Sequence, residues 1–140
     1  MLQILLFWAG KGVDAFRCDM AEMVPAAFWA WVTKQVKEKY PDILFIGEVY
    51  NPTEYRHYIA SGFDYLYDKV GMYDTLREVI RGNRSTHDIC YAWQQTDDIR
   101  QHMLYFLENH DEQRIASDFF AADGLKALPA LIVMALLEQK

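Results

Sequence analysis

Three apolar runs of this chain each end in a carboxylate, and this recurrence limits the folds that the chain can adopt. The runs end at Asp19, Glu48 and Asp111. Each run is short enough for one β-strand, and segments with a helical spacing of apolar residues separate them. Arg17 and Asp19 are two residues apart, so they share one face of the first predicted strand. The pattern therefore predicts several strand ends that present acidic groups.

The order of the predicted elements indicates an α/β fold. Strands that alternate with helices pair in parallel through right-handed crossovers. Asn51, Pro52 and Glu54 predict an N-cap, a first-turn proline and a capping-box glutamate for one helix. We expect helices at 2–10, 25–40, 52–62, 72–81 and 124–139 and strands at 13–18, 43–47, 63–68 and 103–107. A polar stretch at 83–88 leads into an irregular or helical region that extends to about residue 101.

Two architectures fit this order, an open doubly wound sheet and a (β/α)8 barrel. An open sheet would carry a glycine-rich phosphate loop after its first strand, whereas Met20, Ala21 and Glu22 follow Asp19 here. A barrel holds its catalytic groups at the C-terminal ends of the strands, where the three carboxylates fall. A full barrel takes roughly 250 residues, so this chain corresponds to about half of one. We interpret residues 1–140 as part of a single TIM (β/α)8 domain.

Composition excludes several classes of partner. The net charge is −6 without any basic run, and nucleic acid binding needs a basic surface. No apolar stretch is long enough for a membrane span. Residues 1–8 are apolar but lack the basic residues of a signal peptide, so we expect a helix there. The compartment stays open, and a secreted or periplasmic parent protein is compatible with the sequence. Cys18 and Cys90 are expected to be buried apolar residues.

The first two carboxylates suit the hydrolysis of glycosidic bonds. This reaction uses one protonated carboxylic acid and one ionised carboxylate, which retaining enzymes hold about 5–5.5 Å apart. Neighbouring strands lie about 4.8 Å apart, so Asp19 and Glu48 at the tips of adjacent strands can meet this requirement. Arg17 would orient Asp19 through a charged hydrogen bond. Glu48 follows a hydrophobic strand, an environment that suits a general acid.

The three segments resemble conserved regions of the α-amylase family, glycoside hydrolase family 13. Gly12–Asp19 is similar to the fourth barrel strand of that family, which carries the nucleophile. Ile46–Tyr50 is similar to the fifth strand, and Leu107–Asp111 is similar to the seventh. The resemblance covers essentially the whole chain. It implies barrel units four to seven, with the helix that precedes them.

The resemblance also implies roles for individual residues. Asp19 would be the nucleophile, Glu48 the general acid/base, and Asp111 the carboxylate that stabilises the transition state. The implied substrate is an α-glucan or a maltooligosaccharide. Substrate contacts are expected from a further set of residues, which comprises Arg17, His110 and Tyr50. Tyr50 would either stack on a sugar ring or pack in the core.

The sequence departs from the family at positions that bear on calcium. Many members carry a sugar-binding lysine and a calcium-binding histidine three and four residues after the nucleophile. Glu22 and Met23 occupy those positions here, and the Asn-His segment of the third strand is absent. These departures weaken any claim of the usual calcium site and exclude that lysine. Calcium dependence stays open, and we assign no metal ligand. Glu112 and Arg114 are expected to be structural, as an ion pair.

The implied activity is retaining hydrolysis of α-1,4-glucans by double displacement. A transglycosylase or isomerase of the same fold shares this chemistry up to the glycosyl-enzyme. The sequence is also compatible with a non-catalytic accessory domain or with an unrelated α/β domain. The isolated residues 1–140 should have little activity, because half of the cleft wall would be missing. Two exposed strand edges would also favour self-association.

Overall fold

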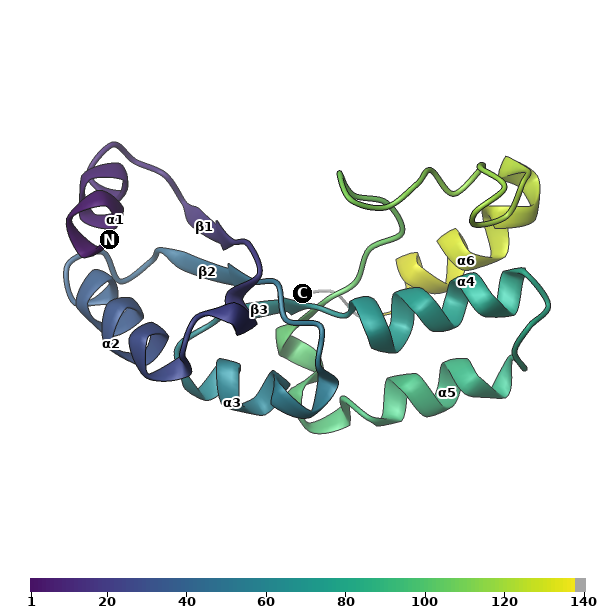
Figure 1. Cartoon of the computed structure of the whole chain (residues 1–140), viewed down its shortest axis with the longest axis horizontal. Coiled ribbons are helices and arrows are strands. Elements are labelled where there is room, and N and C mark those ends of the chain that lie inside the picture. Colours follow the sequence, from purple (N-terminus) through teal and green to yellow (C-terminus); the bar gives the residue numbers. More distant parts are fainter. Residues whose placement is uncertain (138–140) are drawn as a thin grey trace. The chain divides into compact units, whose positions relative to one another are not determined.

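The computed structural model describes residues 1–137, which form two compact units. The first unit is Met1–Tyr67 and the second begins at Asp68 (Figure 1). Residues 138 and 139 of the last predicted helix lie outside the described residues. The expectation that both belong to one catalytic domain stays a prediction.

The first unit is a parallel sheet with helices, as the alternation predicts. Its strands pair in the order β1, β2, β3. Cys18 at the end of β1 lies opposite Gly47 at the end of β2, so both strands end at the same edge. The elements are α1 (Leu2–Ala9), β1 (Ala15–Cys18), η1 (Ala21–Met23), α2 (Ala26–Lys37), β2 (Leu44–Gly47), η2 (Pro52–Glu54), α3 (Tyr55–Ala60) and β3 (Tyr65–Tyr67).

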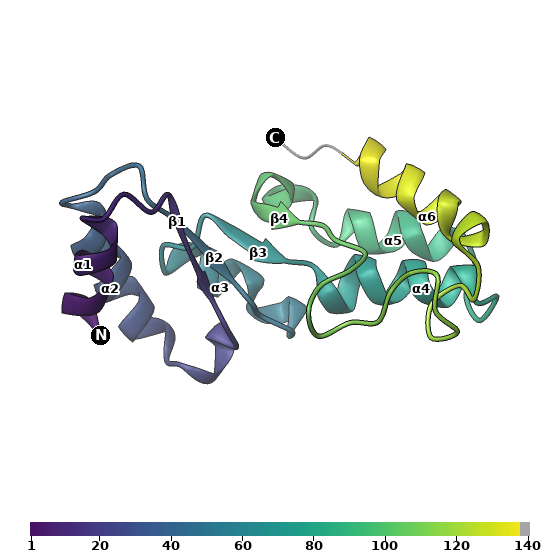
Figure 2. The ribbon, with the colours of Figure 1, turned by 90° about the horizontal axis from the view of Figure 1, so that it is seen from above.

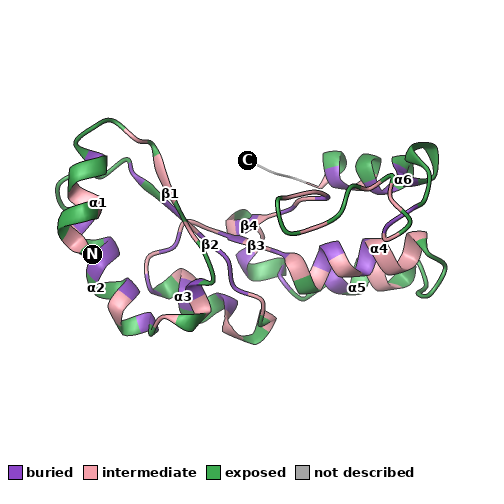
Figure 3. Ribbon diagram, turned by 45° about the horizontal axis from the view of Figure 1, so that its top comes forward, coloured by how far each residue is buried: buried purple, intermediate pink, exposed green. Residues whose placement is uncertain are grey.

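Aromatic packing fills the space between the sheet and α2. Phe45 of β2 is fully buried, and the ring of Phe63 meets it edge-on at 6.4 Å between centroids. Trp29 of α2 packs on the same Phe63 ring at 5.0 Å. Each such side chain contributes about 1.5–3 kcal/mol on burial. Figure 3 shows the buried stripes of α2 that result.

The turn after β2 confirms one part of the capping prediction and corrects another. The Asn51 side chain accepts the Thr53 backbone N–H at 3.1 Å, so Asn51 is an N-cap as expected. The backbone N–H of Asn51, however, donates to Glu22, at 3.2 Å, where the capping box assigns it to Glu54. Glu54 instead contacts His57. A carboxylate distant in sequence therefore takes the expected role of the local one.

The second unit is mainly helical. It contains the π-helix η3 (Lys69–Tyr73), α4 (Asp74–Ile80), α5 (His87–Gln94), the 3-10 helix η4 (Asp97–His102), the short strand β4 (Met103–Leu104) and α6 (Gly124–Leu136). Helices α5 and α6 both pack against α4 (Figures 1 and 2). The helix predicted at 72–81 thus follows a π-turn, and the segment 83–101 is mostly helical. The strand predicted at 103–107 is wrong beyond Leu104, because the chain then enters a loop.

Tyr73 is the centre of the second core. It is fully buried, and its ring stacks on Phe106 at 5.0 Å with an interplanar angle of 6°. Ala127 and Ala130 are buried on the inner face of α6. Their small side chains permit a close approach of α6 to α4. No helix among residues 1–137 is both long and apolar enough to cross a membrane.

Candidate active site

One guanidinium joins the carboxylates at the ends of β1 and β2. Arg17 Nη1 donates to Asp19 Oδ1, and Arg17 Nη2 lies 3.2 Å from Glu48 Oε1. The predicted sharing of one face by Arg17 and Asp19 is therefore confirmed. The two carboxylates differ in exposure, since 68% of the Asp19 side chain is accessible but only 4% of the Glu48 side chain. The cluster thus holds one accessible and one enclosed carboxylate side by side.

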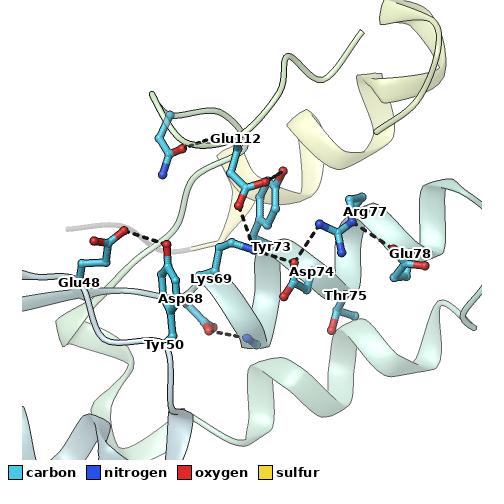
Figure 4. Close-up of polar contacts among 12 residues, drawn as sticks. Glu48, Tyr50, Asp68, Lys69, Tyr73, Asp74, Thr75, Arg77, Glu78 and Glu112 are labelled. Carbon is cyan, nitrogen blue, oxygen red and sulfur yellow. Dashed lines mark hydrogen bonds and ion pairs between the residues drawn. The ribbon is translucent and has the colours of Figure 1, made fainter. Parts of the chain in front are cut away.

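Glu48 is held by donors on both of its oxygens. Its Oε1 accepts the Tyr50 hydroxyl at 3.0 Å as well as the contact from Arg17 (Figure 4). Its Oε2 accepts the Met20 backbone N–H at 3.0 Å. Met20 adopts a left-handed conformation, with φ 43° and ψ 46°, which costs roughly 1–2 kcal/mol for an L-residue. Strain of this kind is often found at functional sites.

Arg17 remains a cation in this setting. Its partial burial opposes the charge, but the hydrogen bond to Asp19 and the field of Glu48 raise the guanidinium pKa. The guanidinium also lies 5.9 Å from the centre of the Tyr67 ring. On the other face of β1, burial raises the pKa of the Cys18 thiol to about 12. Cys18 is half-buried. Cys90 is exposed, so the predicted burial of Cys90 is wrong.

Glu22 is a site residue that the sequence pattern did not identify. Its Oε2 accepts the backbone N–H groups of Tyr50 and Asn51, both at 3.2 Å. It therefore ties the turn after β1 to the segment after β2, which carries Tyr50. The signal in the sequence is a carboxylate three residues after Asp19, which the resemblance marks only as a departure from the family pattern.

The second unit places His110 and Asp111 together. His110 Nε2 lies 3.1 Å from Asp111 Oδ2, and the two side chains are 65% and 49% exposed. The Asn109 side chain accepts the backbone N–H of Asp111 at 2.9 Å and that of Glu112 at 2.8 Å, an Asx turn. Asp111 therefore lies in a capped loop and not at the end of a strand.

Glu112 and Arg114 are not paired with one another, which corrects the predicted ion pair. Glu112 contacts Lys69 at 2.9 Å, and Arg114 contacts Glu108 at 2.8 Å. Both remain structural in the sense that each forms a salt bridge.

Glu22 stands three residues after Asp19, at the position where the resemblance would place a sugar-binding lysine. Within residues 1–137 no three His, Cys, Asp or Glu side chains come together as a possible metal site. Oε2 of Glu22 is already engaged by two backbone N–H groups.

No family model matches the chain. Among curated proteins it is similar to α-1,4-glucan:maltose-1-phosphate maltosyltransferases. The protein from Methylacidiphilum infernorum is 38% identical over 65 residues, which are 46% of this chain and 10% of that protein. The protein from Burkholderia pseudomallei is 32% identical over 78 residues, 55% of this chain and 7% of that protein. The matches thus cover about a tenth or less of these relatives.

Solved structures are similar over more of the chain. An α-amylase from Lactobacillus plantarum has a TM-score of 0.80 at 26% identity, over 99% of this chain and 35% of that one. A maltogenic α-amylase from Thermotoga neapolitana has a TM-score of 0.64 at 30% identity, over 84% of this chain and 27% of that one. A cyclic maltosyl-maltose hydrolase from Arthrobacter globiformis has a TM-score of 0.86 over 99% of this chain and 32% of that one; its 20% identity supports the fold alone. The chain therefore matches about a third or less of each structure.

Proposed function

The chain belongs to the α-amylase family, glycoside hydrolase family 13, and from this premise we propose that it carries the catalytic carboxylates of a retaining α-glucan hydrolase. The observation that carries the proposal is the Arg17 guanidinium, which contacts both Asp19 and Glu48. It places an accessible carboxylate beside an enclosed one at the ends of two adjacent parallel strands, the pair of carboxyl groups that retaining glycoside hydrolysis uses. We also propose that β1 to β4 correspond to strands four to seven of a (β/α)8 barrel.

In the first step, an Asp19 oxygen attacks the anomeric carbon of the bound glucosyl unit. Glu48 gives its proton to the glycosidic oxygen, and the bond between that oxygen and the anomeric carbon breaks. The products are a glycosyl ester of Asp19 and a free sugar hydroxyl. Arg17 keeps Asp19 aimed, while the Met20 N–H and the Tyr50 hydroxyl orient Glu48.

In the second step, the ionised Glu48 removes a proton from the acceptor. The acceptor oxygen attacks the anomeric carbon and releases Asp19, so the configuration is retained. We assign Asp111 to stabilise the positive charge that develops on the sugar ring, and His110 to bind a sugar hydroxyl. Tyr50 is assigned to Glu48 through its hydroxyl, and not to stacking on a sugar.

Glycosyl transfer is a second candidate, because the curated relatives are maltosyltransferases. Both reactions share the ester on Asp19 and differ only in the acceptor. Incubation of the full-length protein with maltooligosaccharides, with and without inorganic phosphate, separates them. Shorter glucans alone indicate hydrolysis, whereas phosphate-dependent formation of maltose 1-phosphate indicates transfer.

Azide rescue tests the roles of the two carboxylates. With α-maltosyl fluoride as donor, azide should restore turnover to the Asp19→Gly variant. The product should be a maltosyl azide with inverted anomeric configuration. Azide should also restore turnover to the Glu48→Ala variant, and there the maltosyl azide should keep the anomeric configuration of the donor. Asp14→Asn, at the opposite and exposed end of β1, is the matched control and should keep wild-type activity. Absence of any glycosyl transfer by the wild-type protein, to water or to sugar, would overturn the proposal in favour of an accessory domain.

A further inference from the structure

Glu112 links the loop that carries Asp111 to the helical part of the second unit. Its Oε1 lies 2.9 Å from Lys69 Nζ, and its Oε2 accepts the Tyr73 hydroxyl at 2.9 Å (Figure 4). Only 10% of the Glu112 side chain is exposed. A carboxylate that is almost enclosed and has a charged and a neutral donor is fixed in position.

The partners of Glu112 are themselves held firmly. Lys69 Nζ also pairs with Asp74 Oδ1 at 3.1 Å, and Tyr73 is fully buried. The π-turn between them depends on Gly71, whose N–H donates to Asp68 Oδ1 at 3.0 Å. A Cβ at this glycine would lie 2.3 Å from the same oxygen. The π-helix η3 is therefore a stable base for Lys69 and Tyr73.

The loop 108–115 keeps its own shape through local bonds. Asn109 caps the N–H groups of Asp111 and Glu112. Glu108 Oε1 accepts the Ile115 N–H at 2.8 Å, which closes the loop. A loop with a fixed internal shape moves as one piece, so the anchoring of Glu112 also determines where the neighbouring Asp111 lies.

We propose that Glu112, clamped by Lys69 and Tyr73, is a positioning residue for Asp111 in the glycosyl transfer reaction. The inference rests on the proposed function, since it concerns the carboxylate assigned to the transition state. Burial and the hydrogen bond to Glu112 raise the pKa of Tyr73 well above its usual value, so the hydroxyl remains a donor. This hydroxyl therefore does not lose its proton at the pH values at which a glycosidase works.

The test compares Glu112→Gln and Tyr73→Phe in the full-length protein. Tyr73→Phe removes one hydrogen bond without changing the buried ring. Glu78→Gln is the control, because Glu78 of α4 pairs with Arg77 at 3.0 Å and accepts from the Asn83 side chain at 2.7 Å, the same combination of a charged and a neutral donor that Glu112 has. Displacing a catalytic group by about 1 Å costs up to about 100-fold in rate. We expect kcat on maltooligosaccharides to fall by about 10- to 100-fold in both test variants, with KM little changed and with the control unaffected.

Hydrogen exchange of the peptide covering residues 108–115 is the second measurement. It should accelerate in both test variants and not in the control. If the wild type is active and the variants keep its kcat, the positioning role is refuted, even when the variants melt at a lower temperature. If the wild type has no glycosyl transfer activity, the proposed function fails, and unchanged exchange in this loop would then refute the clamp independently.

Discussion

The exchange Glu22→Ala separates two explanations of how the segment after β2 is held. The sequence pattern assigns the Asn51 backbone N–H to the local capping-box residue Glu54. The structure assigns it to Glu22, which also accepts the Tyr50 N–H, both at 3.2 Å. Removal of Glu22 should therefore loosen this segment, whereas removal of Glu54 should not.

The size of the effect follows from the exposure of the two donors. The Asn51 N–H is exposed, so water replaces its lost partner, and the cost arises mainly from the part-buried Tyr50 N–H. Loss of a partner for such a donor costs about 1–2 kcal/mol. With a urea m-value of about 2 kcal/mol/M, the unfolding midpoint falls by about 0.5–1 M. The Tyr50 hydroxyl would also lose its alignment on Glu48, which we expect to lower kcat/KM by about tenfold, equivalent to about 1.4 kcal/mol.

Urea unfolding and glucan kinetics should be measured for Glu22→Ala, Glu22→Gln and Glu54→Ala. The Gln variant keeps an acceptor oxygen and should lose less than the Ala variant. Glu54, whose contact with His57 is at the surface, is the matched control and should stay within about 0.5 kcal/mol of the wild type. Greater damage from Glu54→Ala than from Glu22→Ala would refute the reasoning.

Three further predictions rest on single interactions. Arg17→Lys replaces a guanidinium that contacts two carboxylates with a single amine nitrogen. In steady-state kinetics, kcat/KM should therefore fall by about 10- to 100-fold. Retention of activity would argue against the bridging role of Arg17. Because burial raises the pKa of Cys18 to about 12, a thiol reagent at pH 8 should label only the exposed second cysteine until the protein unfolds; rapid labelling of both would contradict this. Hydrogen bonds from Asn83 and Arg77 lower the pKa of Glu78. The stability that the ionised Glu78 contributes is therefore present above about pH 4.3 and is lost as the pH falls through the lowered pKa. In urea unfolding, Glu78→Gln should lose less stability on acidification than the wild type does.

Local periodicity was sufficient to predict the first half of the site. Arg17 and Asp19 share a face because strand side chains repeat every two residues, a property of the sequence itself. Asn51 was predictable as an N-cap for the same reason, since its partner is two residues away. Glu22 could not be predicted in this way, because its partners lie 28 and 29 residues further along the chain.

The region around Asp111 shows a different limit. The apolar run from Met103 to Leu107 predicts a strand, but only two of its residues form one. An extended loop and a strand have the same side-chain pattern and differ in whether a neighbouring backbone pairs with them. The apolar pattern does not predict the π-turn either. It places Asp68 in a strand, whereas the Asp68 side chain accepts the Gly71 N–H and so belongs to the turn.

The register of the sheet explains why Glu48 meets Arg17 at all. Cys18 lies opposite Gly47, so the residues that follow them, Asp19 and Glu48, leave the sheet together. A shift by one residue would turn Glu48 to the opposite face. Gly47 permits this register, because a Cβ there would lie 2.8 Å from Leu66 and 2.9 Å from the ring of Phe63. The carboxylate pair is therefore a property of the packed sheet, and a glycine without any chemistry of its own is one of the residues that create it.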